Sequence, residues 1–185
     1  MFDAQCDLAA LVYEAGQDPD AILRDFAADL GARGFRVIGM VQAGQCSDSS
    51  LSAELLHSGE KLLLARDFDP RASGCQLDAD RLTSAGGRIE RALEAGADLV
   101  IINWFGKREC EGKGLTFLIE RALDADVPLV IAVSSHRFTE WIRFAGGMSV
   151  KLACNRHALD TWWGNVSMQD PAIGQDHQSV CEVLK

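Results

Sequence analysis

Four short apolar runs divide the chain and predict buried strands. They lie at residues 7–13, 36–41, 98–103 and 127–133, and each run is continuous rather than alternating. Continuous apolar runs are typical of parallel strands that are covered on both faces. The pattern therefore predicts a sheet with helices on both of its sides.

Three amphipathic segments separate these runs and predict helices at residues 19–33, 78–95 and 114–125. An aspartate, Asp18 or Asp20, stands at the expected N-cap of the first of these helices. Strand and helix in repeated alternation indicate an α/β protein. We therefore expect a three-layer α/β sandwich with a mainly parallel sheet. We place the strand at 7–13 at its centre, beside the strand at 98–103.

Residues 44–77 interrupt this alternation. Two short apolar pieces at 51–56 and 61–65 flank a polar turn, which predicts a small β-hairpin insertion. Beyond residue 147 the pattern predicts a short helix at 156–163 and a surface tail at about 165–185. The chain has 185 residues, close to the length of one domain at about 150 residues. We therefore expect residues 1–185 to form a single α/β domain.

The charge balance excludes several partners. The formal net charge is −9 and the sequence pI is about 4.8, which disfavours binding to nucleic acid or to an anionic membrane surface. No apolar stretch is long enough for a signal peptide or a membrane span. The six scattered cysteines are typical of free thiols in a reducing compartment. These features predict a cytoplasmic protein.

The loop after the first strand has the position and length of a phosphate-binding P-loop, G-x-x-x-x-G-K-[ST], but lacks its chemistry. Tyr13, Asp18, Pro19 and Asp20 stand where the two glycines, the lysine and the hydroxyl residue are expected. Proline removes an N–H donor, and the acids repel a phosphate. The alternatives are an acidic helix start that complements the helix dipole or an acidic site for a cation or a basic partner.

The loop after the third strand offers positive charge instead. Asn103 stands where nucleoside triphosphatases of the P-loop type carry a Mg²⁺-binding acid. Lys107, Arg108 and Lys113 follow in a glycine-rich segment that opens a helix near Gly114. Backbone N–H groups at a helix start together with cations suit a phosphate-like anion. In the alternative, these cations pair with the neighbouring acids in a solvated turn.

Two further sets of residues are candidates for catalysis or for metal binding. Ser134, Ser135 and His136 follow the fourth strand, but nothing in the pattern predicts a catalytic triad, and a serine N-cap with an exposed histidine is favoured. The weak metal candidates are Cys46, Asp48, His57 and Cys75. Their spacing matches no zinc motif, so isolated thiols are favoured.

Residues 8–152 resemble a bacterial family, domain-of-unknown-function family 2478, which is often encoded beside molybdate-uptake genes. The resemblance is carried by segments within 12–34, 74–78, 92–115 and 127–147. The most specific match comprises Asn103, the Phe105-Gly106-Lys107 tripeptide and Glu109, and Trp104 departs from the usual basic residue. The family is in turn similar to the thermophilic nucleoside-triphosphatases. The resemblance implies a P-loop-type α/β fold and a role near molybdenum or tungsten metabolism.

We therefore predict a non-hydrolysing binding or regulatory protein. Its expected partner is a small anion such as molybdate, tungstate or phosphate, or a nucleotide-like ligand, and we predict no catalytic residue. The predicted ligand-binding residues are Gly16, Gln17, Asp18, Asp20, Asn103, Gly106, Lys107, Arg108, Lys113 and Gly114. One alternative is a residual nucleoside-triphosphatase whose cation is Lys107. Another is a protein-interaction module or homodimer built on exposed Trp141, Trp162 and Trp163.

Overall fold

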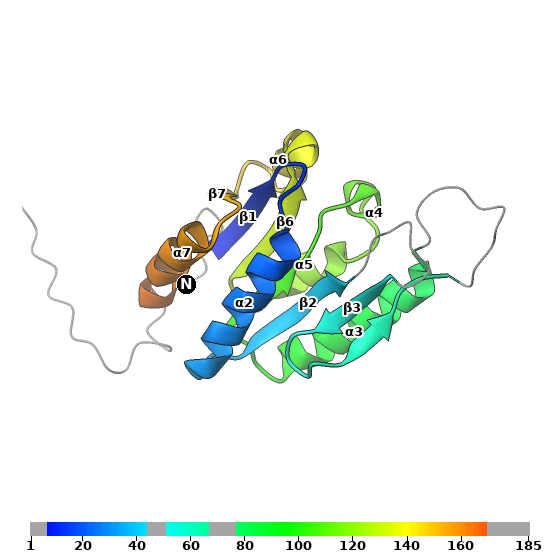
Figure 1. The fold of residues 1–185 in the computed structure, drawn as a ribbon, viewed down its shortest axis with the longest axis horizontal. Coiled ribbons are helices and arrows are strands. Elements are labelled where there is room, and N and C mark those ends of the chain that lie inside the picture. The colour runs from blue at the N-terminus through cyan, green and yellow to red at the C-terminus, as the bar shows by residue number, and fades with distance from the viewer. Residues whose placement is uncertain (1–6, 44–50, 67–76, 170–185) are drawn as a thin grey trace, which may run out of the picture.

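The structure is a computed structural model that describes residues 7–43, 51–66 and 77–169. One seven-stranded sheet runs through these residues in the order β4-β3-β2-β5-β6-β1-β7 (Figure 1). Its strands are β1 (Leu8–Tyr13), β2 (Val37–Ala43), β3 (Ser52–Leu55), β4 (Lys61–Leu63), β5 (Leu99–Ile102), β6 (Leu129–Ser134) and β7 (Val150–Ala153). The pairs among β2, β5, β6, β1 and β7 are all parallel. The predicted mainly parallel sheet is confirmed.

The position predicted for the first strand, at the centre of the sheet and beside β5, is wrong, because β1 lies next to the edge strand β7. β1 pairs with β6 on one side and with β7 on the other, in the registers Leu8↔Leu129 and Ala9↔Val150. The strand β5, which was expected beside it, lies beyond β6. The strands β1, β2, β5 and β6 are all short apolar runs, so the apolar pattern carries no information about which of these runs become neighbours.

The helices form two layers, one on each face of the sheet (Figure 1). Helix α2 (Pro19–Ala32) and helix α7 (Arg156–Gln169) cover one face. Helices α3 (Ala79–Glu94), α5 (Thr116–Asp124) and α6 (Phe138–Phe144) cover the other. Alternate residues of a strand point to opposite faces, so Ala9 and Leu11 join the first core while Leu8 and Ala10 join the second. The predicted three-layer sandwich is confirmed.

The expected hairpin is formed by β3 and β4, which pair in antiparallel register and add to the sheet beside β2. Three elements were not predicted or were predicted too short. β7 and the short helix α4 (Lys107–Cys110) had no apolar signature, and α7 continues to Gln169 rather than ending at residue 163. The tail expected from residue 165 therefore begins with helix.

The three tryptophans on which the interaction-module alternative rests are buried, as expected if their helices pack on the core. Trp141, Trp162 and Trp163 expose 0%, 5% and 1% of their surface. Trp141 packs against Phe105, and Trp163 packs edge-on against Phe35. Amphipathic helices with large aromatic residues cover the sheet here, so these side chains belong to the core and offer no interaction surface. None of the described helices is long and apolar enough to cross a membrane.

Candidate functional site

A cleft of about 770 Å³ opens at the carboxyl edge of the parallel strands. In open α/β sheets, this edge is where ligands bind. Residues at or just after the ends of four strands contribute to its wall, and the remainder comes from the segment around α4 and from residues flanking the hairpin. The lining residues are Tyr13, Gln42, Arg66, Leu77, Trp104, Phe105, Gly106, Lys107, Arg108, Glu111, Lys113, Ser134 and Arg137.

The charge of the cleft is strongly positive. Among the residues that the structure describes, its lining includes five basic side chains, Arg66, Lys107, Arg108, Lys113 and Arg137, and a single carboxylate, Glu111. Lys113 pairs with that carboxylate at 3.4 Å, and Arg137 pairs with a carboxylate at 2.9 Å. Within the described ranges, Lys107 and Arg108 make no ion pair. A protein with a net charge of −9 thus concentrates cations in this cleft.

Glu109 holds the cationic loop in place. Its side chain is 1% exposed, and its two oxygens accept the backbone N–H groups of Gly106 at 2.9 Å and Leu115 at 3.1 Å. These two bonds fix the segment from Gly106 to Leu115 as a compact unit around α4. Gly114 has φ +66°, and a Cβ at this position would collide with the Glu109 carboxylate. Lys107 and Arg108 are therefore carried by an internally braced loop.

This bracing corrects the expectation that the helix start near Gly114 donates to a bound anion. Helix α5 begins at Thr116, and the N–H of Leu115 before it already donates to Glu109. The Glu109 carboxylate thus accepts an N–H at the helix start that was predicted to donate to a ligand. In the alternative of a solvated turn, the loop cations pair with Glu109 and Glu111, but the two oxygens of Glu109 bind backbone N–H groups instead. The predicted Lys113–Glu111 pairing is present at 3.4 Å.

The loop after β1 satisfies its own donors. The N–H of Glu14 donates to the Gln17 side chain at 2.8 Å, and the N–H of Gln17 donates to the carbonyl of Glu14 at 3.1 Å. Asp18 is the N-cap of α2 and accepts the N–H of Ala21 at 2.9 Å. Gly16, Gln17 and Asp18 are exposed and do not line the cleft. The structure supports the acidic helix start over a phosphate cradle at this loop.

Asp20 and Asn103 form a partly buried polar pair beneath the cleft. The Nδ2 of Asn103 donates to Oδ1 of Asp20 at 3.0 Å, and the N–H of Gln42 donates to the same oxygen at 2.9 Å. Burial is the main cause that raises the pKa of Asp20, against the lowering effect of these bonds. Asn103 is 2% exposed, and its Oδ1 has no hydrogen-bond partner among the residues that the structure describes. The pair ties the first turn of α2 to the end of β5.

Two residues with hydroxyl groups line the cleft but were not among the predicted ligand-binding residues. Tyr13 and Ser134 lie at the carboxyl ends of β1 and β6, which are paired in register. Burial, followed by the nearby Asp20 carboxylate, raises the pKa of Tyr13. Tyr13 therefore stays protonated at neutral pH and can donate a hydrogen bond. Its position directly after an apolar run was the signal that could have identified it.

Arg137 is the other cleft residue that the prediction missed, and it belongs to a small network with α6. It donates to Glu140 at 2.9 Å, and the thiol of Cys110 donates to the same carboxylate at 3.2 Å. Burial and the bond to Glu140 raise the pKa of Cys110. A protonated thiol is a weak nucleophile. This arrangement therefore positions a guanidinium and does not activate the cysteine.

The remaining candidates lie elsewhere. Ser135, expected as a cap, donates to Glu14 at 2.6 Å across the neighbouring loops. Of the four metal candidates, Cys46, Asp48 and Cys75 lie outside the described residues, and His57 is in the turn of the hairpin. No cluster of three or more metal-ligating His, Cys, Asp or Glu side chains occurs in the described part of the chain. A metal site that uses these cysteines stays a prediction.

Comparisons with known proteins identify the family and the fold. The model of the family described as "Protein of unknown function (DUF2478)" matches residues 8–162. The chain belongs to this family. Two solved structures share its fold: THEP1 from the hyperthermophile Aquifex aeolicus, with a TM-score of 0.64 and 14% identity, and a human cancer-related nucleoside triphosphatase, with 0.61 and 13%. They match 87% and 88% of this chain over 97% and 98% of their own length.

A curated relative extends the comparison to molybdenum transport. The molybdenum import ATP-binding protein ModC 2 of Bradyrhizobium diazoefficiens is 33% identical over 177 residues. The match covers 94% of the DUF2478 chain and 20% of the relative. The chain therefore spans about a fifth of the length of this relative. The predicted family and the predicted P-loop-type fold are confirmed.

Proposed function

We propose that this DUF2478 protein binds a small oxyanion, or the phosphate-like end of a larger ligand, in the cation-lined cleft and does not hydrolyse nucleoside triphosphates. The observation that carries the proposal is the excess of basic over acidic side chains in a cleft at the carboxyl edge of the sheet. Lys107 and Arg108 stand there without an ion pair among the described residues. An oxyanion supplies the missing counter-charge.

The donors that would hold the anion are of three kinds. Arg108 and Arg137 carry planar guanidinium groups, which suit two oxygens at once, whereas Lys107 contributes a point charge. Tyr13 adds a neutral O–H donor at the end of β1. Because Glu109 already fixes the loop between Gly106 and Leu115, little conformational freedom of the backbone is lost on binding.

Several features argue against hydrolysis. The position of the P-loop lysine is Pro19, which has no N–H to donate and no charge. The position of the Mg²⁺-binding acid is Asn103, whose amide nitrogen donates to Asp20 rather than presenting two oxygens to a metal. The acidic loop after β1 would also repel a triphosphate. Without a lysine and a bound Mg²⁺, the charge that develops on a transferred phosphoryl group has no counterpart at this loop.

The name of the ModC 2 relative suggests which oxyanion to test first. That protein is named for molybdenum import, and molybdate is a tetrahedral dianion of the same class as sulfate and phosphate. We therefore propose that molybdate or tungstate is the ligand of the cleft and that the protein acts as a regulatory binder in the use of the metal. A nucleotide-like ligand would bind through its phosphate groups in the same place.

The test is isothermal titration calorimetry with molybdate, tungstate, sulfate and phosphate. We expect saturable binding of at least one of them, and we expect Arg108→Ala to weaken it by about tenfold or more, the scale of a lost charge-assisted hydrogen bond. Arg33→Ala is the matched control, since Arg33 lies over the Phe35 ring and does not line the cleft. An absence of heat with all four anions would overturn the proposal.

A second assay separates binding from catalysis. Phosphate release from ATP and GTP is measured with Mg²⁺ for the unaltered protein and for Lys107→Ala. We expect no turnover in either sample. Turnover that is lost in Lys107→Ala would support the alternative of a residual nucleoside-triphosphatase in which Lys107 replaces the missing lysine, and would refute the non-hydrolysing assignment.

A further inference from the structure

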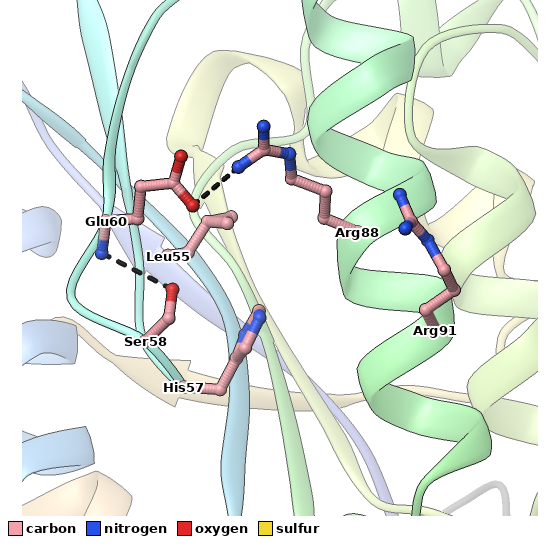
Figure 2. Close-up of a pocket in the computed structure, with 6 residues that line it drawn as sticks. All are labelled: Leu55, His57, Ser58, Glu60, Arg88 and Arg91. Carbon is pink, nitrogen blue, oxygen red and sulfur yellow. Dashed lines mark hydrogen bonds and ion pairs between the residues drawn. The ribbon is translucent and has the colours of Figure 1, made fainter.

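A second pocket, which shares no lining residue with the cleft, lies between the hairpin turn and helix α3. It has a volume of about 340 Å³ and is lined by Leu55, His57, Ser58, Glu60, Arg88 and Arg91 (Figure 2). Arg88 and Arg91 lie about one turn apart on α3, so their side chains leave the same side of the helix. Figure 2 shows Arg88 reaching from the helix to Glu60 and the imidazole of His57 directed toward the helix, while Arg91 runs along the helix itself.

The arginines keep donors available after their internal bonds are counted. Arg88 gives Nη1 to Glu60 at 2.5 Å, and Arg91 gives only its Nε, to the carbonyl of Gly87 at 3.1 Å. A guanidinium has five N–H donors in a planar fork. The terminal nitrogens of Arg91 have no partner among the described residues. They form an unused pair of parallel donors at the pocket.

We propose that this pocket is a second anion site that binds the phosphate group of a small phosphomonoester between Arg88, Arg91 and His57. Phosphate is favoured because its oxygens match the guanidinium fork, and because the two arginines of the described lining outnumber its carboxylate, Glu60. The pocket exceeds the needs of a bare ion, because a single water occupies about 30 Å³ of liquid against about 340 Å³ here. The buried Leu55 side chain offers an apolar contact to the organic part of the ester.

The charges around His57 make this site sensitive to pH. Arg36, Arg88 and Arg91 are its basic neighbours and Glu60 is its acidic one. Burial, followed by Arg36, lowers the pKa of His57 below its ordinary value, while Glu60 acts in the opposite direction. A bound phosphate anion favours the imidazolium, so phosphate raises the pKa of His57. The pocket and the cleft are independent proposals because they share no lining residue.

The first test follows the ring protons of His57 by NMR during titration with inorganic phosphate, phenyl phosphate and acetate. We expect phosphate and its phenyl ester to raise the pKa of His57, with tighter binding of the ester. Arg91→Ala is expected to weaken binding by about tenfold or more. Arg33→Ala again serves as the control for the loss of one exposed cation. Acetate that binds as tightly as phosphate would overturn the assigned ligand class.

The second test removes a negative charge from the pocket. Its expected result is tighter phosphate binding, which a loss of folding cannot produce. Glu60→Gln removes the only carboxylate of the pocket lining and should tighten phosphate binding roughly threefold, the scale of a partly exposed charge interaction. Arg108→Ala should leave the response of His57 unchanged, since Arg108 belongs to the cleft. The proposal is refuted if phosphate leaves the His57 resonances unmoved, or if Arg91→Ala responds like the unaltered protein.

Discussion

The carboxylate of Glu109 is predicted to be a main structural support of the cationic loop, and Glu109→Gln tests this with a change of one atom. The two carboxylate oxygens accept the N–H groups of Gly106 and Leu115. A glutamine has one oxygen and one NH₂ group, so one backbone N–H must face another donor. With the side chain 1% exposed, water cannot easily take over the lost role.

The magnitude follows from that one unsatisfied donor. Leaving a buried N–H without an acceptor costs about 1–3 kcal/mol, and each kcal/mol lowers Tm by about 2–4 °C in a protein of this size. We therefore expect the Tm of Glu109→Gln to fall by about 2–12 °C, with a matching shift in urea unfolding followed by tryptophan fluorescence. Binding of the oxyanion in the cleft should weaken as well, because Lys107 and Arg108 lose their fixed backbone.

Glu111→Gln is the matched control for stability. Glu111 lies in the same loop but is exposed, and it pairs with Lys113 at 3.4 Å on the surface. Such a pair contributes at most about 1 kcal/mol. If Glu109→Gln is no less stable than Glu111→Gln, the Glu109 carboxylate does not brace the loop and the reasoning fails.

Three further predictions concern the interior. For Asp20→Asn, the raised folded-state pKa of Asp20 means that its contribution to stability falls as the pH rises through that pKa. At pH 7 the variant should therefore have a higher free energy of unfolding than the unaltered protein, and it should lose this advantage in acid. The same difference in free energy at both pH values would contradict the prediction. Asn103→Asp replaces the hydrogen bond of 3.0 Å from Asn103 to Asp20 with two facing carboxylates. We therefore expect urea unfolding at pH 7 to show a free energy of unfolding that is lower by about 3 kcal/mol or more. The loss should be recovered in acid, where the carboxylates are protonated. Gly39→Ala should lower the free energy of unfolding by about 2 kcal/mol or more, because Gly39 has φ +124° and a Cβ there collides with the carbonyl of Ile101. Gly31→Ala, in open space on α2, should instead raise it by about 0.5–1 kcal/mol. Similar effects of the two changes would refute the strain argument.

The apolar pattern predicted most of the fold because burial on both faces leaves a strong signal in parallel strands. The runs at 7–13, 36–41, 98–103 and 127–133 all became strands, and the three amphipathic segments became α2, α3 and α5. The pattern could not give the order of the strands, because β5 and β6 are equally apolar. It also missed β7, an edge strand whose Val150 and Leu152 alternate with exposed Lys151 and Ala153.

The site was predicted less completely, for reasons of geometry. Lys107, Arg108, Lys113 and Gly106 do line the cleft, because one glycine-rich loop carries them together in the sequence. Arg66 and Arg137 come from segments that are far apart in the sequence, and no local motif predicts that both line the cleft. In the alternative of a solvated turn, Glu109 pairs with cations, but a buried carboxylate accepts backbone N–H groups wherever the chain turns back on itself, and that turn is visible only in three dimensions.

The two halves of the carboxyl edge have opposite electrostatic character in the described part of the chain. On the β1 side, Asp18 caps α2 and Asp20 accepts from Asn103, so internal carboxylates take the donors that a bound phosphate would otherwise use. On the β5 side, Glu109 does the same for the backbone N–H groups but leaves the side chains of Lys107 and Arg108 free of ion pairs in the described structure. Negative charge therefore has one open place at this edge, the cleft beside α4. On the proposed function, we expect a ligand of this cleft to be recognised by side chains rather than by a backbone cradle, with the arginines, lysines and Tyr13 of the lining deciding its identity.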